Sequence, residues 1–456
     1  MKYLSFRSLS WPLVGAVNLF TACTSKVPDK SKSPNFIVIL TDDQNWVGTS
    51  FLMDPDEPRS KSDYYQTPNM ERLARMGMRF TDGYASSPQC YATRRCILTG
   101  MSPPRHIMQK DTEVWTAEYR KQLSIPQMLK QTDPAYKTAH FGKWDTRYDQ
   151  VPPDVMGYDY SDGYTNNDTG GSNSSIEWPA ALDDPKLIFS ITDRSVKFME
   201  EQVKLGNPFY LQVSHYAVHL GITYTQKSIE KYRNISPGTK HQIPEFAAMT
   251  EDMDTGIGIL IDKAEELELL DNTYIIFLSD NGGRTSLPLN RDQKISRNFP
   301  LRGGKGNLYE GGIRVPFIVT GPGIKPNSIS RVPVTATDIF PTLADIAGYE
   351  KILPDVIDGG SFKDVIHNNG AGEIKRNLPY LIFHHNTNMS AIREGNYKLT
   401  INWRDDLQHK IELFNLAEDI SEANDLSKEM PELAEDLHNK LVGYLKDTNA
   451  VLWFKE

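Results

Sequence analysis

The chain has 456 residues, of which 39% are hydrophobic and 24% are charged, so it can fill a large core and is neither disordered nor collagen-like. Its formal net charge of −9 offers no global basic field, and we expect no nucleic-acid partner. An anionic substrate would have to be held by local cations or by a metal. We expect one large domain and one small one.

The first 22 residues have the pattern of an export signal. Two basic residues precede a mostly apolar run over residues 11–20, which is shorter than the roughly 20 residues that a membrane span needs. Small residues then lead to Cys23, and this ending resembles a bacterial lipobox, which implies cleavage before Cys23 and its lipidation. We expect a signal peptide over 1–22, a flexible tether over 23–33 and a lipid-anchored protein of the bacterial cell envelope, in the periplasm or at the cell surface. An ordinary secreted protein with a coincidental cysteine is the alternative.

Strand and helix patterns alternate along most of the remaining chain, which predicts an α/β fold. In chain order we expect a strand at 35–41, helices at 68–76 and 93–99, a strand at 138–141, a helix at 191–203, a strand at 209–213, a helix at 244–269, a strand at 274–279 and a helix at 337–347. Beyond about residue 353, short strand-like runs precede a helix near 430–445, which predicts a smaller α+β region on an antiparallel sheet. The expected domains are therefore 34–353 and 354–456.

The strands at 35–41 and 274–279 are almost continuously apolar, as is typical of strands buried on both faces of a parallel sheet. Each is followed directly by oxygen-bearing side chains, which are Asp42, Asp43, Asp280 and Asn281. Because ligands of open parallel sheets bind at the carboxyl ends of the strands, we expect these side chains to converge. Helix capping after the first strand and a tight turn after the second would explain either pair alone.

Residues 86–100 are the most informative stretch. Cys90 opens a predicted helix, and Arg94 follows one turn later on the same face. The amino end of a helix favours an anion or a thiol of lowered pKa. On these residues alone, Cys90 is either a reactive nucleophile or, more commonly for a lone cysteine, a small buried hydrophobe. Cys96, further along the helix, is expected to be a packing residue.

The stretch from Cys90 resembles the sulfatase signature C-x-[P/A]-x-R followed by L-T-G. Segments similar to other motifs of that family follow one another in order, at residues 67–74, 80–85, 142–144, 305–316, 338–343 and 412–416. The sequence is identified as a member of the formylglycine-dependent type I sulfatases, within the alkaline phosphatase superfamily. This resemblance implies a large mixed, mainly parallel sheet sandwiched by helices, with catalysis in residues 34–353, and a smaller C-terminal α+β subdomain on an antiparallel sheet.

A sulfate ester is a hard oxyanion, and a hard divalent cation held by oxygen ligands is its natural partner. The oxygen-bearing side chains after the two apolar strands supply such ligands. The resemblance implies that the cation is calcium and that its ligands are Asp42, Asp43, Asp280, Asn281 and the modified Cys90.

The resemblance further implies that a formylglycine-generating enzyme converts Cys90 to formylglycine and that one hydroxyl of the hydrated aldehyde attacks sulfur in line. Arg94, Lys143 and Lys305 would hold the sulfate oxygens and offset the charge that develops there. His219 ends a segment that resembles the family's strand followed by A-P-H, and it would act as general acid together with Lys305. The alternative for His219 is a histidine that simply caps a strand end.

Asp145 is the main departure from the family pattern, because the G-K-W-H motif has a histidine at that position. A carboxylate could serve as the base that the histidine provides. It could equally repel sulfate, or lie at the surface while Arg147 or His140 takes its place.

We therefore expect a sulfatase that acts on sulfated polysaccharides or their oligosaccharides, a substrate class inferred from location and family habit. One alternative is a phosphodiester or phosphonate monoester hydrolase of the same superfamily, which can use the same nucleophile and metal edge. The other is a sugar-binding lipoprotein whose site has lost turnover, an alternative that Asp145 keeps open.

Overall fold

The computed structural model describes Met1 and residues 33–106, 112–144, 151–171, 179–385, 389–404 and 408–450. Cys23 and nearly all of the expected signal peptide and tether therefore lie outside the described residues, as do Asp145 and Arg147. Within the described ranges, none of the helices combines the length and the hydropathy that a membrane span requires.

An eight-stranded sheet forms the centre of the molecule, in the order β11-β2-β10-β9-β1-β7-β4-β5. Its strands are β1 (Asn35–Thr41), β2 (Met78–Phe80), β4 (Lys137–Gly142), β5 (Tyr160–Ser161), β7 (Phe209–Ser214), β9 (Thr273–Ser279), β10 (Phe317–Thr320) and β11 (Ser328–Ser330). Strand β1 pairs in parallel with β7 on one side and with β9 on the other. Strand β10 runs antiparallel to both of its neighbours, so its amino end lies at the edge where β1 and β9 end.

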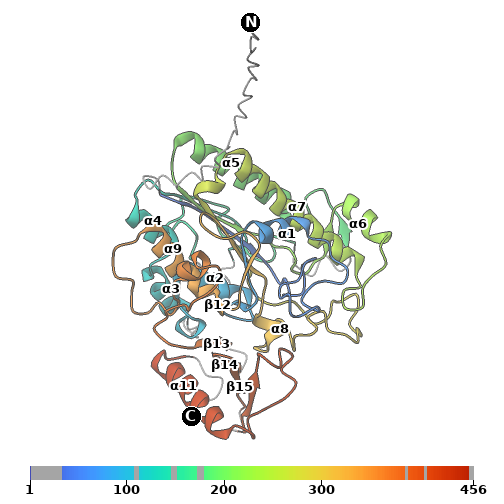
Figure 1. The fold of residues 1–456 in the computed structure, drawn as a ribbon, viewed down its shortest axis with the longest axis vertical. Coiled ribbons are helices and arrows are strands. Elements are labelled where there is room, and N and C mark those ends of the chain that lie inside the picture. The colour runs from blue at the N-terminus through green and yellow to red at the C-terminus, as the bar shows by residue number, and fades with distance from the viewer. Residues whose placement is uncertain are drawn as a thin grey trace.

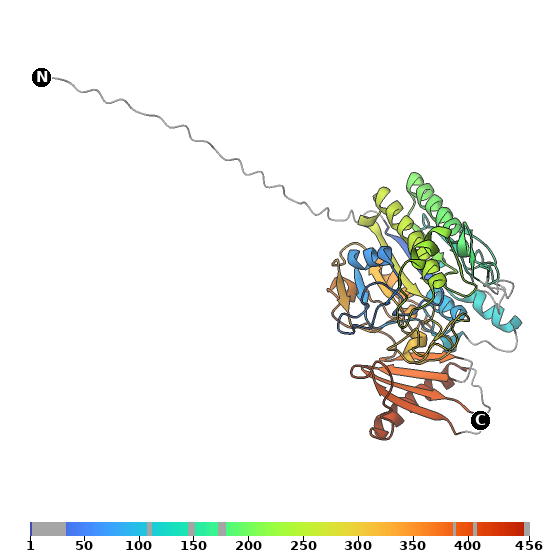
Figure 2. The same ribbon diagram turned by 90° about the vertical axis from the view of Figure 1, so that its right-hand side faces the viewer.

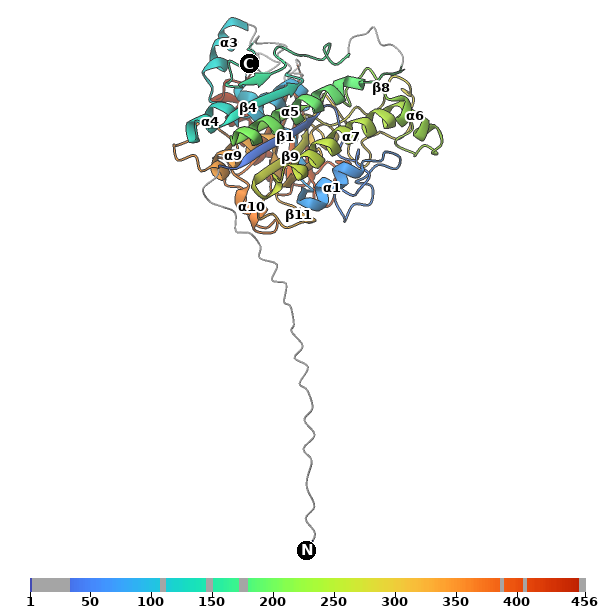
Figure 3. The ribbon, with the colours of Figure 1, turned by 90° about the horizontal axis from the view of Figure 1, so that it is seen from above.

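Helices cover both faces of this sheet (Figures 1 and 3). Along β1, Ile37 and Ile39 pack into one core, whereas Phe36, Val38 and Leu40 pack into the other, as the two-residue period of a strand requires. The first core lies under α1 (Pro68–Met76), α5 (Ile188–Leu205) and α7 (Pro244–Glu266), and the second under α2 (Cys90–Thr99), α4 (Ile125–Thr132) and α9 (Ile339–Ala347). These two layers give the continuous apolar strands their burial on both faces.

The remaining described elements are short or peripheral. The helices are α3 (Thr112–Lys121), α6 (Gln226–Arg233), α8 (Glu310–Ile313) and α10 (Lys363–His367), with 3-10 turns at Pro103–Arg105, Pro185–Leu187, Leu270–Asn272 and Ala336–Asp338. Two small pairings join β3 (Gly83–Tyr84) to β12 (Val334–Thr335) and β6 (Ala180–Ala181) to β8 (Thr223–Tyr224).

A separate antiparallel sheet lies beyond the large one (Figure 2), in the order β13 (Leu381–His385), β14 (Met389–Glu394), β15 (Tyr397–Asn402) and β16 (Lys410–Asn415). Helix α11 (Pro431–Asp447) packs Leu437 and Leu441 against it in a core of its own. The predicted fold class is confirmed: a mixed, mainly parallel sheet between helices, with a second antiparallel sheet. The domain boundary at residue 353 stays a prediction, and Ile357, Phe362 and Ile366 beyond it pack into the core of the large sheet.

Candidate active site

The oxygen-bearing side chains after β1 and β9 meet at one edge of the sheet. Thr41 pairs with Ser279, so both strands end at the same level and the next residues leave side by side. The Asp280 amide donates to Thr41 O at 3.0 Å, and Nδ2 of Asn281 donates to Oδ1 of Asp43 at 2.8 Å. The predicted convergence of Asp42, Asp43, Asp280 and Asn281 is therefore present in the structure.

Three more segments reach the same edge. Lys143 follows β4, and its amide donates to Ser214 O at the end of β7, the strand that leads to His219. Lys305 precedes β10, and because β10 runs against its neighbours, this segment arrives at the carboxyl ends of β1 and β9. The Lys305 amide donates to Gly283 O at 3.0 Å, which ties it to the loop after β9.

Two cations of the cluster contact Asp42 and Asp280. Nζ of Lys143 donates to Oδ2 of Asp42 at 2.6 Å, and Nη2 of Arg94 donates to Oδ2 of Asp280 at 2.6 Å. Nη1 of Arg94 also donates to Lys143 O at 2.7 Å. Burial opposes ionisation of Asp42, yet Lys143 and the other cations hold its pKa well below the usual range. Burial and the charge of Asp42 raise the pKa of Asp280 to about 7, against the opposing effect of Arg94.

Asp43 lies near two further basic side chains of the cluster. Its Oδ1 lies 2.5 Å from Nζ of Lys305, and its Oδ2 lies 3.9 Å from Nε2 of His219. Burial works against its charge, but Lys305 lowers the pKa of Asp43, and Asp43 in turn raises the pKa of Lys305 despite burial. Burial lowers the pKa of His219, an effect that Asp43 and Asp42 oppose.

Cys90 lies at the amino end of α2 and is 3% exposed. Its Sγ and one carboxylate oxygen each of Asp42 and Asp280 all lie within 4.8 Å of one another. The Gly306 amide donates to Pro88 O at 3.0 Å, which brings the segment of Lys305 beside the start of α2. Cys96 is fully buried on the same helix, and burial raises the pKa of its thiol well above the usual range.

Three buried oxygens at this edge have no hydrogen-bond partner among the described residues: Oδ1 of Asp42, Oδ2 of Asp43 and Oδ1 of Asn281. Unpaired buried polar oxygens are costly unless a ligand completes them. Carboxylate and amide oxygens are the ligands that hard divalent cations prefer. The residues present therefore fit a hard divalent cation.

The structure thus brings together nine of the predicted residues, which are Asp42, Asp43, Cys90, Arg94, Lys143, His219, Asp280, Asn281 and Lys305. Of the groups considered beside Asp145, His140 packs edge-on against Trp144 and Tyr158, and Nε2 of His140 lies 3.1 Å from Oγ of Ser214. Burial lowers the pKa of His140 to about 3.

Two residues near the site were not predicted from the sequence. Lys186 is 3% exposed, and its Nζ donates to Leu220 O at 2.9 Å, directly beside His219. Arg284 lies in the loop after β9, with Nε 3.9 Å from Oδ2 of Asp43. A lysine after a proline and an arginine in a polar loop carry no motif that would single them out.

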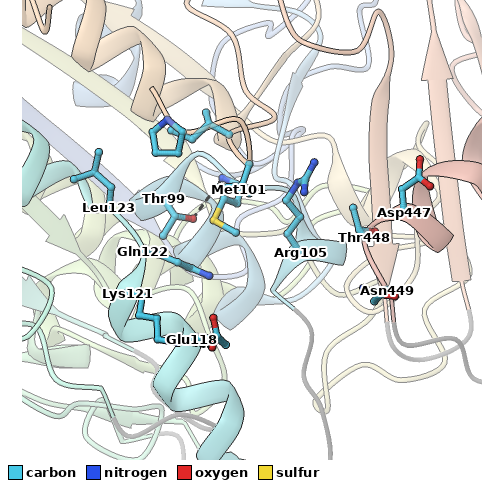
Figure 4. A pocket seen from close by; sticks show the side chains of 13 residues that line it. Thr99, Met101, Arg105, Glu118, Lys121, Gln122, Leu123, Asp447, Thr448 and Asn449 are labelled. Carbon is cyan, nitrogen blue, oxygen red and sulfur yellow. Dashed lines mark hydrogen bonds and ion pairs between the residues drawn. The ribbon is translucent and has the colours of Figure 1, made fainter. Parts of the chain in front are cut away.

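A cavity of about 460 Å³ lies elsewhere, and its lining includes Thr99, Met101, Arg105 and Asn449 (Figure 4). Thr99 is the last residue of α2, whose ten residues place it about 14 Å along the helix from Cys90. This cavity is therefore separate from the cluster around Cys90.

A sheet edge that gathers cations, open carboxylate oxygens and a cysteine at a helix amino end suits an enzyme that acts on oxyanion esters. The chain belongs to the sulfatase family, since the Sulfatase family model matches residues 34–349. A second model, "N-sulphoglucosamine sulphohydrolase, C-terminal", matches residues 304–447. The protein is accordingly a sulfuric ester hydrolase, as predicted.

Several named sulfatases are similar to this protein over most of its chain. A "Sulfatase" of Formosa agariphila is 28% identical over 94% of this chain and 92% of its own. An "Ulvan-active sulfatase" of the same organism is 25% identical over 81% of this chain and 72% of its own. The crystal structure of Ps i-CgsB in complex with k-i-k-neocarrahexaose is 25% identical, with a TM-score of 0.73, and covers 93% of this chain and 95% of that one. These likenesses favour the sulfatase prediction over the phosphonate and phosphodiester alternatives.

Proposed function

We propose that this sulfatase is formylglycine- and calcium-dependent and that it removes sulfate from sulfated polysaccharides or their oligosaccharides. The observation that carries the proposal is the single buried cluster in which Arg94, Lys143 and Lys305 surround unpaired oxygens beside Cys90. The catalytic domain is proposed to be residues 34–353, followed by the C-terminal subdomain 354–456.

Asp42, Asp43, Asp280, Asn281 and the modified Cys90 would hold the calcium ion, whose charge polarises the sulfate oxygens when it is bound. Formylglycine made from Cys90 would supply, as its hydrate, the hydroxyl that attacks sulfur. The chain also supplies three cations of its own. Arg94, Lys143 and Lys305 would orient the sulfate and stabilise the negative charge that develops as the ester bond breaks.

His219 is the proposed general acid. Its Nδ1 lies 2.9 Å from Leu220 O, and because a carbonyl only accepts, Nδ1 carries a proton there. Nε2 then faces Asp43 and can hold the second proton for the leaving oxygen of the sugar. Lys305, on the other oxygen of Asp43, would share this role.

Asp145 is proposed to act as the base for the second half of the reaction, in place of the family's histidine. An Asp145→Asn variant should then release the desulfated sugar once per enzyme molecule and stop, because sulfate would not leave. Rapid-quench measurement of that burst tests the assignment, and steady turnover equal to that of the unaltered enzyme would refute it.

The location follows from the expected export signal. We propose an extracytoplasmic protein, anchored to the membrane of the bacterial cell envelope through lipid on Cys23. Sulfated polysaccharides are met outside the cytoplasm, and one relative is named a "Putative extracellular sulfatase Sulf-1 homolog". A Cys23→Ser variant should move from the membrane fraction to the soluble fraction, and an unchanged fractionation would exclude the anchor.

The main experiment combines mass spectrometry and turnover. The chain is made in a host with a formylglycine-generating enzyme, and the peptide containing Cys90 should show an aldehyde in place of the thiol. Sulfate release is then measured on sulfated oligosaccharides of algal galactans and of glycosaminoglycans. Cys90→Ala should be inactive, whereas Cys96→Ala, on the same helix, should retain activity. A persistent thiol together with full activity would refute the proposal.

A further inference from the structure

Arg284 is the most exposed of the cations around the candidate site. Its side chain is 44% exposed, compared with 15% for Lys305, 12% for His219, 5% for Arg94 and 0% for Lys143. The buried cations line the interior of the site, whereas Arg284 presents charge to solvent beside it. A ligand group that lies outside the sulfate pocket would therefore meet Arg284 first.

The position of Arg284 relative to His219 is bounded by the structure. Nε of Arg284 and Nε2 of His219 each lie 3.9 Å from the same atom, Oδ2 of Asp43, so they cannot be further apart than twice that distance. That span is comparable to the width of a sugar ring. A sugar whose leaving oxygen contacts His219 would therefore have its other substituents within reach of Arg284.

The donors of Arg284 remain available. A separation of 3.9 Å is beyond hydrogen-bond distance, so Asp43 attracts the guanidinium without using its N–H groups. In the parts of the chain that the structure describes, no other acidic side chain forms an ion pair with Arg284. A guanidinium presents its donors as a planar fork that matches carboxylate or sulfate oxygens two at a time.

The backbone of Arg284 is fixed by buried neighbours. Nη1 of Arg297 donates to Arg284 O at 3.2 Å, and Nδ2 of Asn298 donates to Gly283 O at 2.8 Å. Arg297 and Asn298 are 2% and 1% exposed. Because its main chain is held in advance, only the side chain of Arg284 has to be ordered when a ligand binds.

We infer that Arg284 is a specificity-determining residue that binds a second anionic group, a sulfate or a carboxylate, on the sugar that His219 protonates. The inference rests on the proposed function, because His219 marks the leaving oxygen. It names the substrate class more narrowly: glycans with two anionic groups close together. In a chain of net charge −9, such a substrate needs a dedicated cation outside the sulfate pocket.

The test compares kcat/KM on sugars that differ in their second charge. The probes are a monosulfated monosaccharide, a disulfated monosaccharide and a monosulfated disaccharide that contains one hexuronate. Arg284→Gln should lower kcat/KM for one or both doubly anionic probes by about 10- to 100-fold, as expected for a lost hydrogen-bonded ion pair, with little change on the monosulfated probe. Arg284→Lys should recover part of the loss. The probe that loses activity identifies the group as sulfate or carboxylate.

Arg291→Gln is the matched control, since Arg291 is exposed on the same loop and its loss changes net charge equally. Equal losses on all three probes, or no change on any of them, would overturn the inference. Failure of the proposed function looks different: the unaltered chain, with the aldehyde verified at position 90, would release no sulfate from any probe. Turnover by the unaltered chain with an unchanged preference in Arg284→Gln would refute only the role of Arg284.

Discussion

In both Asp42 and Asp43, one carboxylate oxygen contacts a lysine and the other is left for a ligand. Oδ2 of Asp42 accepts from Lys143, and Oδ1 of Asp43 lies against Lys305. The other oxygen of each carboxylate has no hydrogen-bond partner among the described residues. The lysines thus hold both carboxylates ionised, which keeps the open oxygens able to bind a cation.

A substitution of Arg94 alone tests this arrangement of cations and carboxylates. An Arg94→Lys variant keeps the charge but cannot contact both Asp280 and the carbonyl of Lys143, so we expect kcat/KM for sulfate release to fall by about 100- to 1,000-fold. Arg95→Lys, on the next position of α2, is the control and should stay within a few-fold of the unaltered enzyme. Near-normal activity of Arg94→Lys would contradict the assigned role.

From the sequence, we predicted those site residues that come directly after a recognisable strand or lie within a motif. The sequence did not reveal Lys186, whose Nζ is held by the carbonyls of Gly170 and Leu220 on two other loops. Burial lowers the pKa of Lys186 to about 8, and this too depends on how those loops pack. Contacts of this kind are set by tertiary structure and leave no local pattern.

At the scale of elements, the short helix α8 connects the C-terminal sheet to the loop after β9. Nζ of Lys398, on β15, lies 2.8 Å from Glu310 and 2.9 Å from Glu422, and all three side chains are fully buried. The other end of α8 reaches the site, since the Gly282 amide donates to Gly312 O at 2.9 Å. Through α8, which lies beside the C-terminal sheet (Figure 1), that sheet is therefore linked to the edge that holds Asp280 and Asn281.

Lys398→Met should unfold more easily, because two buried carboxylates would lose their shared cation. We expect the free energy of unfolding to fall by about 3–5 kcal/mol in urea titrations followed by circular dichroism. Adding Glu422→Gln to the same chain should recover part of that loss, because Glu422 would no longer be a buried carboxylate without a cation, whereas Glu310 keeps Arg314 as its partner. Unchanged stability of the single variant would show that the buried ion pairs contribute little.

Glu422 should give the protein a pH-dependent stability. Burial raises the pKa of Glu422 to about 7 from 4.5, against the pull of Lys398, so the folded state binds a proton more tightly than the unfolded state. This contribution is present at low pH and is lost as pH rises through 7. Relative to the unaltered protein, Glu422→Gln should therefore gain about 1–3 kcal/mol of stability between pH 5 and pH 8, measured by urea unfolding. A difference that is flat with pH would contradict this.

Element prediction was close for several segments and missed others. The helix at 68–76 was placed without error, and the strands at 138–141 and 209–213 each extend by only a residue or two. Helices α3, α4 and α6, of ten, eight and eight residues, were not predicted. The antiparallel direction of β10, which delivers Lys305 to the site, depends on strand order and cannot be deduced from local sequence.

At the scale of the whole molecule, the proposed calcium site joins the ends of β1 and β9 across the centre of the sheet. A ligand that binds only the folded state stabilises it in proportion to the logarithm of its concentration. Adding millimolar calcium to chelator-treated protein should therefore raise the midpoint of thermal unfolding by several degrees, measured by scanning calorimetry. Asp43→Asn should abolish that shift, whereas Asp54→Asn, away from the cluster, should preserve it. An equal shift in both variants would place the calcium elsewhere.

The burial of Cys90 sets the order in which the chain would be modified, folded and loaded with calcium. Cys90 is 3% exposed in a helix whose residues are all buried, so a modifying enzyme has no path to its sulfur once folding is complete. The proposed metal ligands Asp43 and Asn281 are 238 positions apart and meet only after the sheet has formed. The aldehyde would therefore be made on the unfolded chain, and calcium would enter afterwards. A chain that folded too early would keep its thiol, lack one of the five proposed calcium ligands and remain inactive.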